Sequence, residues 1–339
     1  MRRLSLNLLT CSATVLLLGA LSLPAMRVVT LTDTRAANPI ASARVFGVYV
    51  DPWHVDDWTR RVGAAPRMVA KFEAFSRNKA IDGYLRESQR RGIRHVMISW
   101  EPWKPVPAAR GLGAQQRPQP GFRNADIAAG AQDRYVHRFA RSLSRFPGVV
   151  YLRYAHEMNG FWYPWSRDAR GYVRAWRRVV RIVRAAGARN VRFVWSINPN
   201  LYEPPDQRLP NMRRYWPGSR FVDLIGSTAI NFGGQKEYSV ERFHGALEGV
   251  HAAFHKPVVL TETNTAFEGR VAWLRDLRRM LDRSPWIRAV AWSQLPSRGK
   301  VQRKSSIGDT DWDVTTDPAG AKALRAIVQN EEADGGVGR

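Results

Sequence analysis

Residues 149–198 contain one complete strand–helix–strand unit. They read VVYLRYAHE (149–157), then GYVRAWRRVVRIVRAA (171–186), and then VRFVWSIN (191–198). The first and third runs are short, mostly apolar and rich in β-branched and aromatic residues, as expected of strands buried on both faces. The middle run carries apolar residues at three- and four-residue spacing, which predicts an amphipathic helix. The unit therefore predicts two parallel strands joined by a crossover helix.

The same alternation recurs along most of the chain. Strand-like runs occur eight times, at 45–50, 68–72, 95–100, 149–157, 191–198, 222–231, 257–264 and 287–294. Helical periodicity occurs at 81–91, 126–146, 171–186, 240–254, 271–282 and 319–329. The connection 199–219 is mostly loop-like, so one helix is expected to be short or missing. Eight such units predict an α/β protein with a single-domain (β/α)8 TIM barrel. A doubly wound open sheet is the alternative, although no glycine-rich dinucleotide motif follows the first strand.

The N-terminal residues have the layout of an export signal. Arg2 and Arg3 precede an apolar stretch that is densest at 13–23, and small residues follow it. We therefore expect the protein to be secreted or extracellular, and membrane-anchored if the signal is not cleaved. The expected segments are a signal peptide or signal anchor (1–26), a linker (27–42), the barrel (43–330) and a polar C-terminal tail (331–339).

The composition excludes several classes of protein. The 339 residues include one cysteine, Cys11, which rules out a disulfide framework and a cysteine-built metal site. The seven histidines show no metal-ligand spacing, and no P-loop or GxSxG motif occurs, so we expect neither a metal nor a cofactor. The formal net charge of +24 suggests an anionic partner, but an exported protein has little use for nucleic acid. The arginines of 170–189 are interpreted as a solvated helix face.

Polar and aromatic residues gather where the expected strands end, which is the face that carries the active site in a barrel of this kind. Seven of the 13 tryptophans lie there, which favours an aromatic-lined cleft over tryptophans that only fasten loops. Sugar rings pack on aromatic planes and their hydroxyls bind polar groups, so this face predicts carbohydrate binding. The strand-end residues are Asp51, Trp53, Trp100, Glu101, Trp103, His156, Glu157, Asn159, Trp162, Tyr163, Trp165, Trp195, Asn198, Asn231, Glu262, Asn264, Trp292 and Gln294.

Glu157 and Glu262 are the strongest candidate pair among them. Each ends an expected strand, and each is followed two residues later by Asn. A carboxylate in such a place is costly unless it faces a polar site or a partner, and Arg153 is the structural alternative as that partner. Retaining glycoside hydrolysis needs two such carboxyl groups, about 5–5.5 Å apart. Strand alternation places Arg153 on the same face as Glu157, where it is expected to hold a carboxylate ionised.

The segment RYAHEMNGFWYPW (153–165) resembles glycoside hydrolase family 26, and KPVVLTETN (256–264) and AVAWSQ (289–294) support the resemblance. It covers roughly residues 44–328 and implies a retaining (β/α)8 enzyme. It implies that Glu157 is the general acid/base and Glu262 the nucleophile. It also implies that His156 places the sugar and that Trp162 and Trp292 are stacking platforms. The family is best known for endo-β-1,4-mannanases, and other members cleave β-xylans and β-glucans.

Three features depart from the family pattern. The seventh expected strand reads Thr-Glu-Thr-Asn (261–264) where the family often has Ser-Glu and a small residue. Ile230 stands where a Tyr usually lies beside the nucleophile, and Ile donates no hydrogen bond, so Tyr202 is a candidate replacement. Glu101 stands where mannanases tend to carry a His, which puts mannan specificity in question; an ion pair with an arginine is its structural alternative. The further candidates for substrate binding are Asn159, Trp100, Asp51, Trp195 and Asn231, with capping of the next element as the alternative for Asp51.

The expected function is hydrolysis of a β-linked, mannan-like or related polysaccharide by a secreted monomer. Two alternatives come from other classes of protein. One is a carbohydrate-binding barrel with impaired catalysis, suggested by Ile230. The other is a cell-surface protein that binds acidic polysaccharide, suggested by the net charge of +24. An anionic cell-surface polymer is accordingly a second candidate partner.

Overall fold

The computed structural model describes residues 44–76, 81–106, 113, 116–233, 238–265, 269–294 and 312–333. All of these belong to the compact unit Pro39–Arg339. The expected signal (1–26) and linker (27–42) lie outside the described residues. Among the described helices, none combines the length and the apolar character that crossing a membrane requires.

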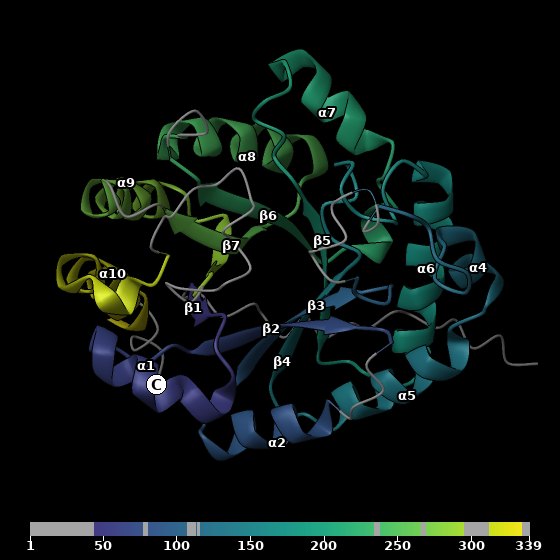
Figure 1. The fold of residues 1–339 in the computed structure, drawn as a ribbon, viewed down its shortest axis with the longest axis horizontal. Helices are drawn as coiled ribbons and strands as arrows, with labels where there is room; N and C mark the ends of the chain where they lie inside the picture. The colour runs from purple at the N-terminus through teal and green to yellow at the C-terminus, as the bar shows by residue number, and fades with distance from the viewer. Residues whose placement is uncertain are drawn as a thin grey trace, which may run out of the picture. The chain divides into compact units, whose positions relative to one another are not determined.

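Eight parallel strands close into a barrel in chain order, with β8 hydrogen-bonded to β1 (Figure 1). The strands are β1 (Val45–Val48), β2 (Met68–Ala74), β3 (His95–Glu101), β4 (Val149–Tyr154), β5 (Val191–Ile197), β6 (Leu224–Asn231), β7 (Val258–Thr265) and β8 (Ile287–Trp292). Each strand coincides with one of the strand-like runs of the sequence. The predicted (β/α)8 barrel is therefore confirmed.

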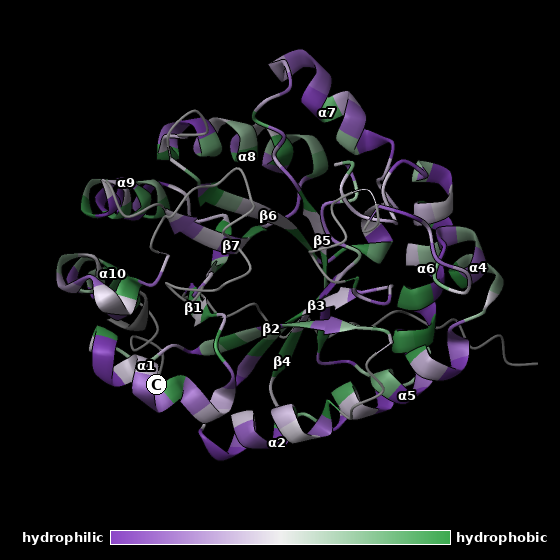
Figure 2. Cartoon of the chain, in the orientation of Figure 1, coloured by the Kyte–Doolittle hydropathy of each residue, from purple (hydrophilic) through white to green (hydrophobic). Residues whose placement is uncertain are grey.

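Helices surround the barrel, as Figure 1 shows. They are α1 (Val55–Val62), α2 (Asp82–Arg90), α4 (Asn124–Ala129), α5 (Asp133–Ser144), α6 (Ala169–Ala185), α7 (Pro205–Arg213), α8 (Val240–Phe254), α9 (Arg270–Arg283) and α10 (Pro318–Ala333). Short 3-10 helices occupy Pro52–His54 (η1), Ser219–Phe221 (η3) and Val314–Thr316 (η4). Figure 2 shows hydrophilic residues on the outer helices, most continuously on α7, whose one buried residue is Met212.

The amphipathic pattern of α6 shows how such a helix is fixed to the barrel. Tyr172, Trp176 and Val183 lie on its buried stripe, and each such apolar side chain contributes roughly 1.5–3 kcal/mol when taken from water. At the N-terminus the Asp168 carboxylate accepts a hydrogen bond from the Gly171 N–H, which satisfies one of the unpaired donors of the first turn. The opposite face of α6 carries the arginines.

Three local expectations differ from the structure. The single helix expected at 126–146 is two helices, α4 and α5, because Gly130 takes a left-handed conformation (φ 105°) that ends α4. Helix α1 was not expected, and the loop-like 199–219 contains the short helix α7. Strand β4 ends at Tyr154 rather than at Glu157, since Ala155 has φ 45° and leaves the strand geometry.

The barrel interior changes from apolar to polar along the strands. Its apolar layer draws side chains from all eight strands: Val45, Met68, Ala70, Met97, Tyr151, Val194, Leu224, Val259, Ala289 and Ala291. Alternate residues of a strand face the same side, so the next inward side chains on β3, β4 and β5 are Ser99, Arg153 and Ser196. The interior thus ends in a polar layer at the carboxyl ends of the strands, where barrel enzymes carry their active sites.

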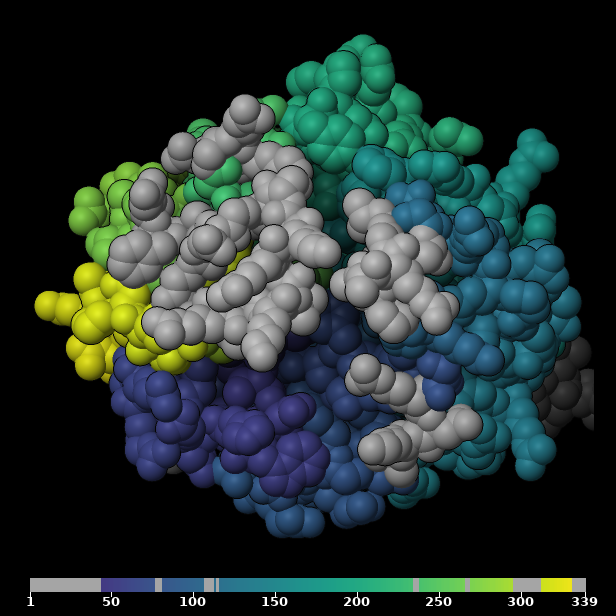
Figure 3. All heavy atoms as spheres, viewed as in Figure 1, coloured from purple at the N-terminus to yellow at the C-terminus, as the bar shows by residue number. Residues whose placement is uncertain are grey.

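The face seen in Figure 1 is drawn with all heavy atoms in Figure 3. The first βα units, in purple and blue, adjoin α4 to α6, in blue and teal, and α7, in green, continues the same face.

Candidate active site

Arg153 is the centre of the polar layer. Its side chain is fully buried, and the guanidinium donates hydrogen bonds to one hydroxyl on each of β3, β5 and β6 and to one carboxylate. Nε binds Ser196 Oγ at 2.8 Å and Nη1 binds Ser99 Oγ at 3.1 Å. Nη2 binds Thr228 Oγ1 at 3.4 Å. A guanidinium held on all sides in this way is a fixed positive charge, because it does not lose its proton in proteins.

Glu262 receives the remaining bond of Arg153. Nη1 lies 2.5 Å from Glu262 Oε1, and 17% of the Glu262 side chain is exposed. The register of β7 shifts against β6, where Ser227 pairs with Leu260 and Thr228 pairs with Glu262. This bulge leaves Thr261 without a partner in the ladder and turns both Thr261 and Glu262 inward. Burial raises the pKa of Glu262, Arg153 opposes that shift, and the charge of Glu157 adds to it.

Glu157 lies in the loop that follows β4 and is held by three neutral donors. Trp162 Nε1 donates to Oε2 at 2.9 Å, Asn198 Nδ2 donates to Oε1 at 3.0 Å, and Thr228 Oγ1 donates to Oε1 at 2.5 Å. Its backbone has φ 52°, a conformation that a residue with a side chain rarely adopts. Its N–H is fixed on the Ser196 carbonyl at 2.8 Å. Strained backbone held in place by its surroundings is a feature of functional sites.

Thr228 connects the two carboxylates. Its hydroxyl donates to Glu157 and accepts from Arg153, whose guanidinium also binds Glu262. The structure thus places Glu157 and Glu262 in one hydrogen-bonded network, in which Arg153 contacts Glu262. The roles assigned to these three residues from the sequence stay predictions.

Asn159 is placed as a clamp rather than as a sugar-binding group. Its Nδ2 donates to the Asn198 carbonyl at 2.7 Å, and its Oδ1 accepts from the Asn198 N–H at 2.9 Å. Both polar atoms of the buried amide are therefore used within the protein. The expectation of substrate contact is corrected: Asn159 fastens the loop after β4 to the end of β5 and so positions Asn198 against Glu157.

His156 lies beneath Tyr163. Its Nε2 is 2.9 Å from the Tyr163 hydroxyl, and its Nδ1 is buried. Trp165 Nε1 fixes the His156 carbonyl at 2.7 Å, and the Trp165 ring stacks on Tyr163 at 4.3 Å. Burial, together with Arg153, holds the pKa of His156 well below its usual value, so the ring is neutral. The expected direct contact with sugar is not seen here, because Nε2 is used by Tyr163 and Nδ1 is buried without a hydrogen-bond partner among the described residues.

Tyr163 faces the carboxylates. Burial raises the pKa of its hydroxyl, and the charges of Glu157, Glu101 and Glu262 raise it further, so all three carboxylates lie within electrostatic reach. Glu101 at the end of β3 accepts a hydrogen bond from Trp103 Nε1 at 3.1 Å. The structure thus brings a third carboxylate to the side of the site formed by Trp103 and Tyr163, whose rings meet edge to face at 5.9 Å.

Trp162 lies beside Glu157. It is partly exposed and its indole N–H donates to the Glu157 carboxylate, and its role as a stacking platform stays a prediction. Asp51 is exposed at the end of β1 and precedes η1 without a side-chain capping bond. The structure therefore leaves the Asp51 carboxylate accessible to solvent and does not support its alternative role as a cap.

Three tryptophans expected to contact substrate lie in the layer between the barrel and the helices. Trp100 stacks on Phe139 of α5 at 4.4 Å, and Trp195 packs on Trp216 at 5.0 Å. Trp292 pairs in register with Val48, and both belong to the outer hydrophobic core. All three are fully buried. The physical reason for this correction is strand alternation, since each tryptophan is adjacent in sequence to an inward residue and therefore points outward.

Asn231 and Tyr202 are also placed away from the predicted contacts. Asn231 uses its amide for Thr265 and for the N–H groups of Gly233 and Tyr238, so it shapes the loop after β6. The Tyr202 hydroxyl donates to Asn200 Oδ1 at 3.2 Å, and 54% of its surface is exposed. It is therefore not the replacement for the tyrosine at position 230.

Ile230 itself packs against Trp312 and Phe232. The hydrogen bond that it is unable to give to Glu262 is supplied by Arg153 instead. The departure at position 230 therefore leaves Glu262 with a strong donor.

Two aromatic residues of the site were not among the sequence-based candidates. Tyr49 bonds Ser99 Oγ at 3.0 Å and lies within the electrostatic field of Arg153 and Glu262, and burial raises its pKa. Phe72 on β2 stacks on Tyr49 at 5.0 Å, lies 5.8 Å from the His156 ring and is partly exposed. The signal was present in the sequence: both positions continue the inward-facing alternation that begins at Val45 and Met68.

Metal-binding clusters are not found in the described part of the chain, where no three His, Cys, Asp or Glu side chains come together suitably. Two carboxylates at the carboxyl ends of barrel strands, surrounded by aromatic side chains, define the class of a two-carboxylate glycoside hydrolase.

Comparison with known proteins identifies the family. Residues 134–316, more than half of the chain, match the family model of glycosyl hydrolase family 26, and the chain belongs to this family. The matched range includes both Glu157 and Glu262.

Among curated proteins, the chain is 25% identical over 249 residues to Endoglucanase H of Acetivibrio thermocellus, covering 69% of this chain and 24% of that protein. It is 25% identical over 141 residues to Beta-1,3-xylanase TXYA of a Vibrio species, covering 41% and 28% of the two chains. The chain thus spans about a quarter of the length of these curated relatives.

Solved structures share the fold. A β-mannanase of the same family from Bacteroides ovatus superposes with a TM-score of 0.61 at 16% identity, over 86% of this chain and 90% of that one. An endo-β-1,4-mannanase variant from Cellulomonas fimi superposes with a TM-score of 0.56 at 14% identity, over 84% and 71% of the chains.

Proposed function

We propose that this protein hydrolyses a β-linked polysaccharide with retention of configuration, with Glu262 as nucleophile and Glu157 as general acid/base. The observation that carries the proposal is the single hydrogen-bonded network that joins both carboxylates through Arg153 and Thr228. Retaining hydrolysis requires two carboxyl groups acting on one glycosidic bond.

In the first step, Glu262 attacks the anomeric carbon while Glu157 donates its proton to the departing glycosidic oxygen. The attacking group must be ionised, and the ion pair with Arg153 favours the ionised form of Glu262. A covalent glycosyl ester on Glu262 and a released sugar fragment result.

In the second step, Glu157 has lost its proton and acts as the base. It removes a proton from water, which attacks the anomeric carbon and displaces Glu262. Trp162, Asn198 and Thr228 donate hydrogen bonds to Glu157. These bonds keep the side chain in the same orientation when it changes from acid to base. Because each displacement inverts the anomeric carbon, the product has the configuration of the substrate.

The aromatic side chains around the pair supply the binding surface. Trp162 is the stacking platform nearest to Glu157, and Tyr163 and Phe72 are the further aromatic groups of the same site. Asp51 is the exposed polar candidate at the end of β1. Glu101 adds a third carboxylate on the side of Trp103.

The substrate class is proposed from the relatives. Their names span endoglucanase, β-1,3-xylanase and β-mannanase. We propose a β-mannan or a related β-glycan cut by an endo-acting enzyme. The purified protein should release reducing sugar from one member of a panel of β-mannans, β-xylans and β-glucans. Glu262→Ala should abolish this release, and equal activity of the variant would sink the proposal.

The alternative of a binding barrel without turnover was suggested by Ile230. The Arg153–Glu262 contact weakens that alternative, because the nucleophile retains a charged donor. Binding of a β-glycan to the wild-type protein with no release of reducing sugar from any polymer in the panel would favour it.

We also propose that the protein is exported and acts as a monomer outside the cytoplasm. The support is the layout of residues 1–26, with two arginines ahead of an apolar stretch. N-terminal sequencing of the protein recovered from the culture medium or from membranes distinguishes a cleaved signal from an anchor.

A further inference from the structure

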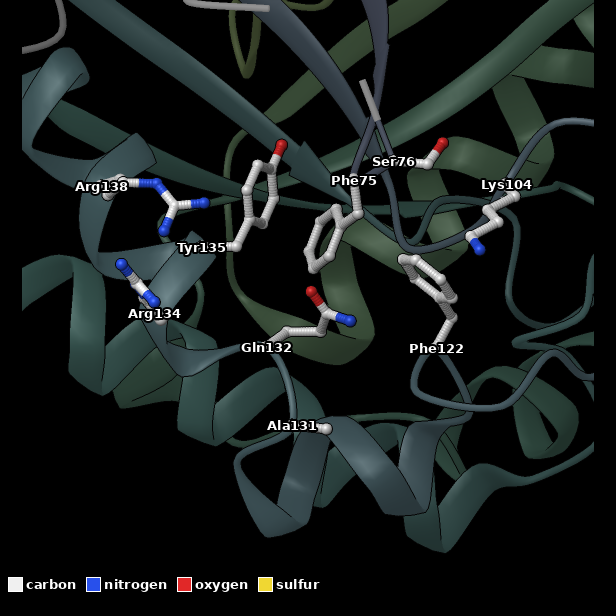
Figure 4. Close-up of a pocket in the computed structure, with 9 residues that line it drawn as sticks. All are labelled: Phe75, Ser76, Lys104, Phe122, Ala131, Gln132, Arg134, Tyr135 and Arg138. Carbon is white, nitrogen blue, oxygen red and sulfur yellow. The ribbon is translucent and has the colours of Figure 1, made fainter. Parts of the chain in front are cut away.

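A second polar site lies among the chain segments that follow β2 and β3. It is a hollow of about 300 Å³ between these segments and the start of α5 (Figure 4). That volume is near the lower end of the roughly 300–1,000 Å³ found for small-molecule sites, so it suits one sugar residue. Its lining residues are Phe75, Ser76, Lys104, Phe122, Ala131, Gln132, Arg134, Tyr135 and Arg138.

Three of the lining residues are cations, and none of the nine is acidic. Arg134 and Arg138 are four residues apart on α5 and therefore lie on one face of the helix. Figure 4 shows their guanidinium groups on one side of the hollow and the Lys104 amine on the other. Like charges at this helical spacing repel by a few tenths of a kcal/mol, so an anion between them would relieve the repulsion.

The nearby acidic groups are already committed to other partners. Asp133, the neighbour of Arg134, binds Arg178 at 2.5 Å, and Asp126 binds Arg123 at 2.8 Å. Within the described ranges no carboxylate pairs with Lys104, Arg134 or Arg138. The positive charge of the hollow is therefore available to a ligand.

The remaining lining groups combine one partly buried aromatic ring with polar atoms. The Tyr135 ring packs 4.9 Å from the Phe75 ring, which is itself buried in the core below the hollow. Gln132 uses Nε2 for the Gly121 carbonyl, and its Oε1 lies at the hollow, near Phe75 in Figure 4. The Tyr135 hydroxyl accepts from Trp100 Nε1 at 3.0 Å and keeps its own proton for donation.

The hollow is connected to the carboxylate site by a short run of contacts. Lys104 directly follows Trp103, whose indole N–H binds Glu101 and whose ring meets Tyr163. Phe75 directly follows β2, and its N–H binds the Glu101 carbonyl at 2.8 Å. The hollow and the carboxylate site are therefore linked through Glu101 and the segments that follow β2 and β3.

We propose that this hollow binds a carboxylate-bearing sugar branch of the polysaccharide, with Arg134 and Arg138 on the carboxylate and Lys104 as an additional cation. The arginine fork matches a planar carboxylate through two parallel hydrogen bonds, which favours this anion over a neutral branch. The inference rests on the proposed hydrolysis of a β-glycan, and it assigns to that enzyme a preference for acidic branches.

The test compares two forms of one polymer: galactomannan, and the same galactomannan with its galactose branches oxidised to carboxylates. For each protein we measure the ratio of kcat/KM on the oxidised polymer to kcat/KM on the untreated one. Arg134→Ala/Arg138→Ala should lower this ratio about tenfold, through KM. Arg141→Ala is the matched control, since Arg141 is exposed on the same helix and does not line the hollow. A ratio equal to that of the wild type in the double variant would overturn the proposal.

Affinity electrophoresis in gels containing either polymer separates failure of this proposal from failure of the hydrolase proposal. If neither polymer is cleaved, the hydrolase proposal on mannan fails. Stronger retardation of the wild type than of the double variant by oxidised polymer alone still supports the site. Equal retardation of the two proteins by oxidised polymer overturns it. Circular dichroism of each variant verifies that the barrel remains folded.

Discussion

The two carboxylates at the mouth of the barrel have different neighbours. Glu157, after β4, is contacted by neutral donors from Trp162, Asn198 and Thr228. Glu262, on β7, is contacted by the guanidinium of Arg153. The backbone differs as well: Glu157 sits at φ 52° in a loop, whereas Glu262 lies within a strand at a bulge.

The difference indicates how two identical side chains come to act differently. Arg153 keeps its charge throughout the pH range in which proteins are folded, so it favours the ionised form of Glu262 at every stage. The donors to Glu157 are neutral, so gain or loss of its proton breaks no ion pair. Acid/base assignments in enzymes follow from such differences in environment.

Replacing Arg153, the cation bound to Glu262, should have the largest effect and tests whether the two carboxylates differ because of this ion pair. Arg153→Met should lower kcat/KM by about 10²–10³-fold and destabilise the fold by about 3–5 kcal/mol, since a buried carboxylate loses its partner. Burial and Glu157 already raise the pKa of Glu262, and loss of Arg153 raises it further. Because Glu262 must be ionised to attack, the acid limb of the pH profile of kcat/KM should move to higher pH. Arg153→Lys keeps the charge and should move that limb less; identical shifts would contradict the assigned role.

Removing the hydrogen bonds that position Asn198 against Glu157 should lower activity less than replacing Arg153. Asn159→Ala removes the two hydrogen bonds between the Asn159 side chain and the Asn198 backbone, and should lower kcat about tenfold while changing KM less than twofold. Steady-state kinetics on the best polymer of the panel provides the measurement. A large rise in KM with unchanged kcat would instead return Asn159 to substrate binding.

Trp162 lies at the carboxylate site, whereas Trp100 lies between the barrel and the helices. Variants of the two should therefore differ in whether they change activity or stability. Trp162→Phe removes the N–H donated to Glu157 and should lower kcat/KM severalfold. Trp100→Phe removes the hydrogen bond to the Tyr135 hydroxyl in the outer layer and should cost about 1 kcal/mol of unfolding free energy without changing KM. Kinetics and urea unfolding of both variants check the pair. A raised KM in Trp100→Phe would contradict its outward placement.

The smallest effect is expected at Tyr202. Its hydroxyl binds Asn200 and not Glu262, so Tyr202→Phe should change kcat/KM by less than about twofold. A loss comparable to that of Arg153→Met would show that the nucleophile depends on Tyr202.

Much of the fold was predictable because a parallel barrel leaves a strong pattern in the sequence. Strands buried on both faces need continuous apolar runs, and all eight were visible. The break between α4 and α5 was less visible because the apolar spacing continues across Gly130, whose left-handed backbone ends α4.

The site was predictable in its carboxylates and not in its tryptophans. A glutamate buried at a strand end is costly unless a partner or a polar site offsets the loss of water, so its position is informative. A tryptophan is stable on either side of a buried strand, so its position is not. Trp100 and Trp195 were assigned to the wrong side because strand-end position was used without alternation. The inward turn of Glu262 depends on a bulge that apolar patterning does not reveal.

Azide rescue of Glu157→Ala and Glu262→Ala tests the assignment of the two roles most directly. In each variant the small anion replaces the missing carboxylate, and the anomeric configuration of the glycosyl azide formed from an activated aryl β-glycoside is read by NMR. We predict the β-azide from Glu157→Ala, because Glu262 still forms the glycosyl enzyme, and the α-azide from Glu262→Ala. Exchanged products, or the same anomer from both variants, would contradict the account.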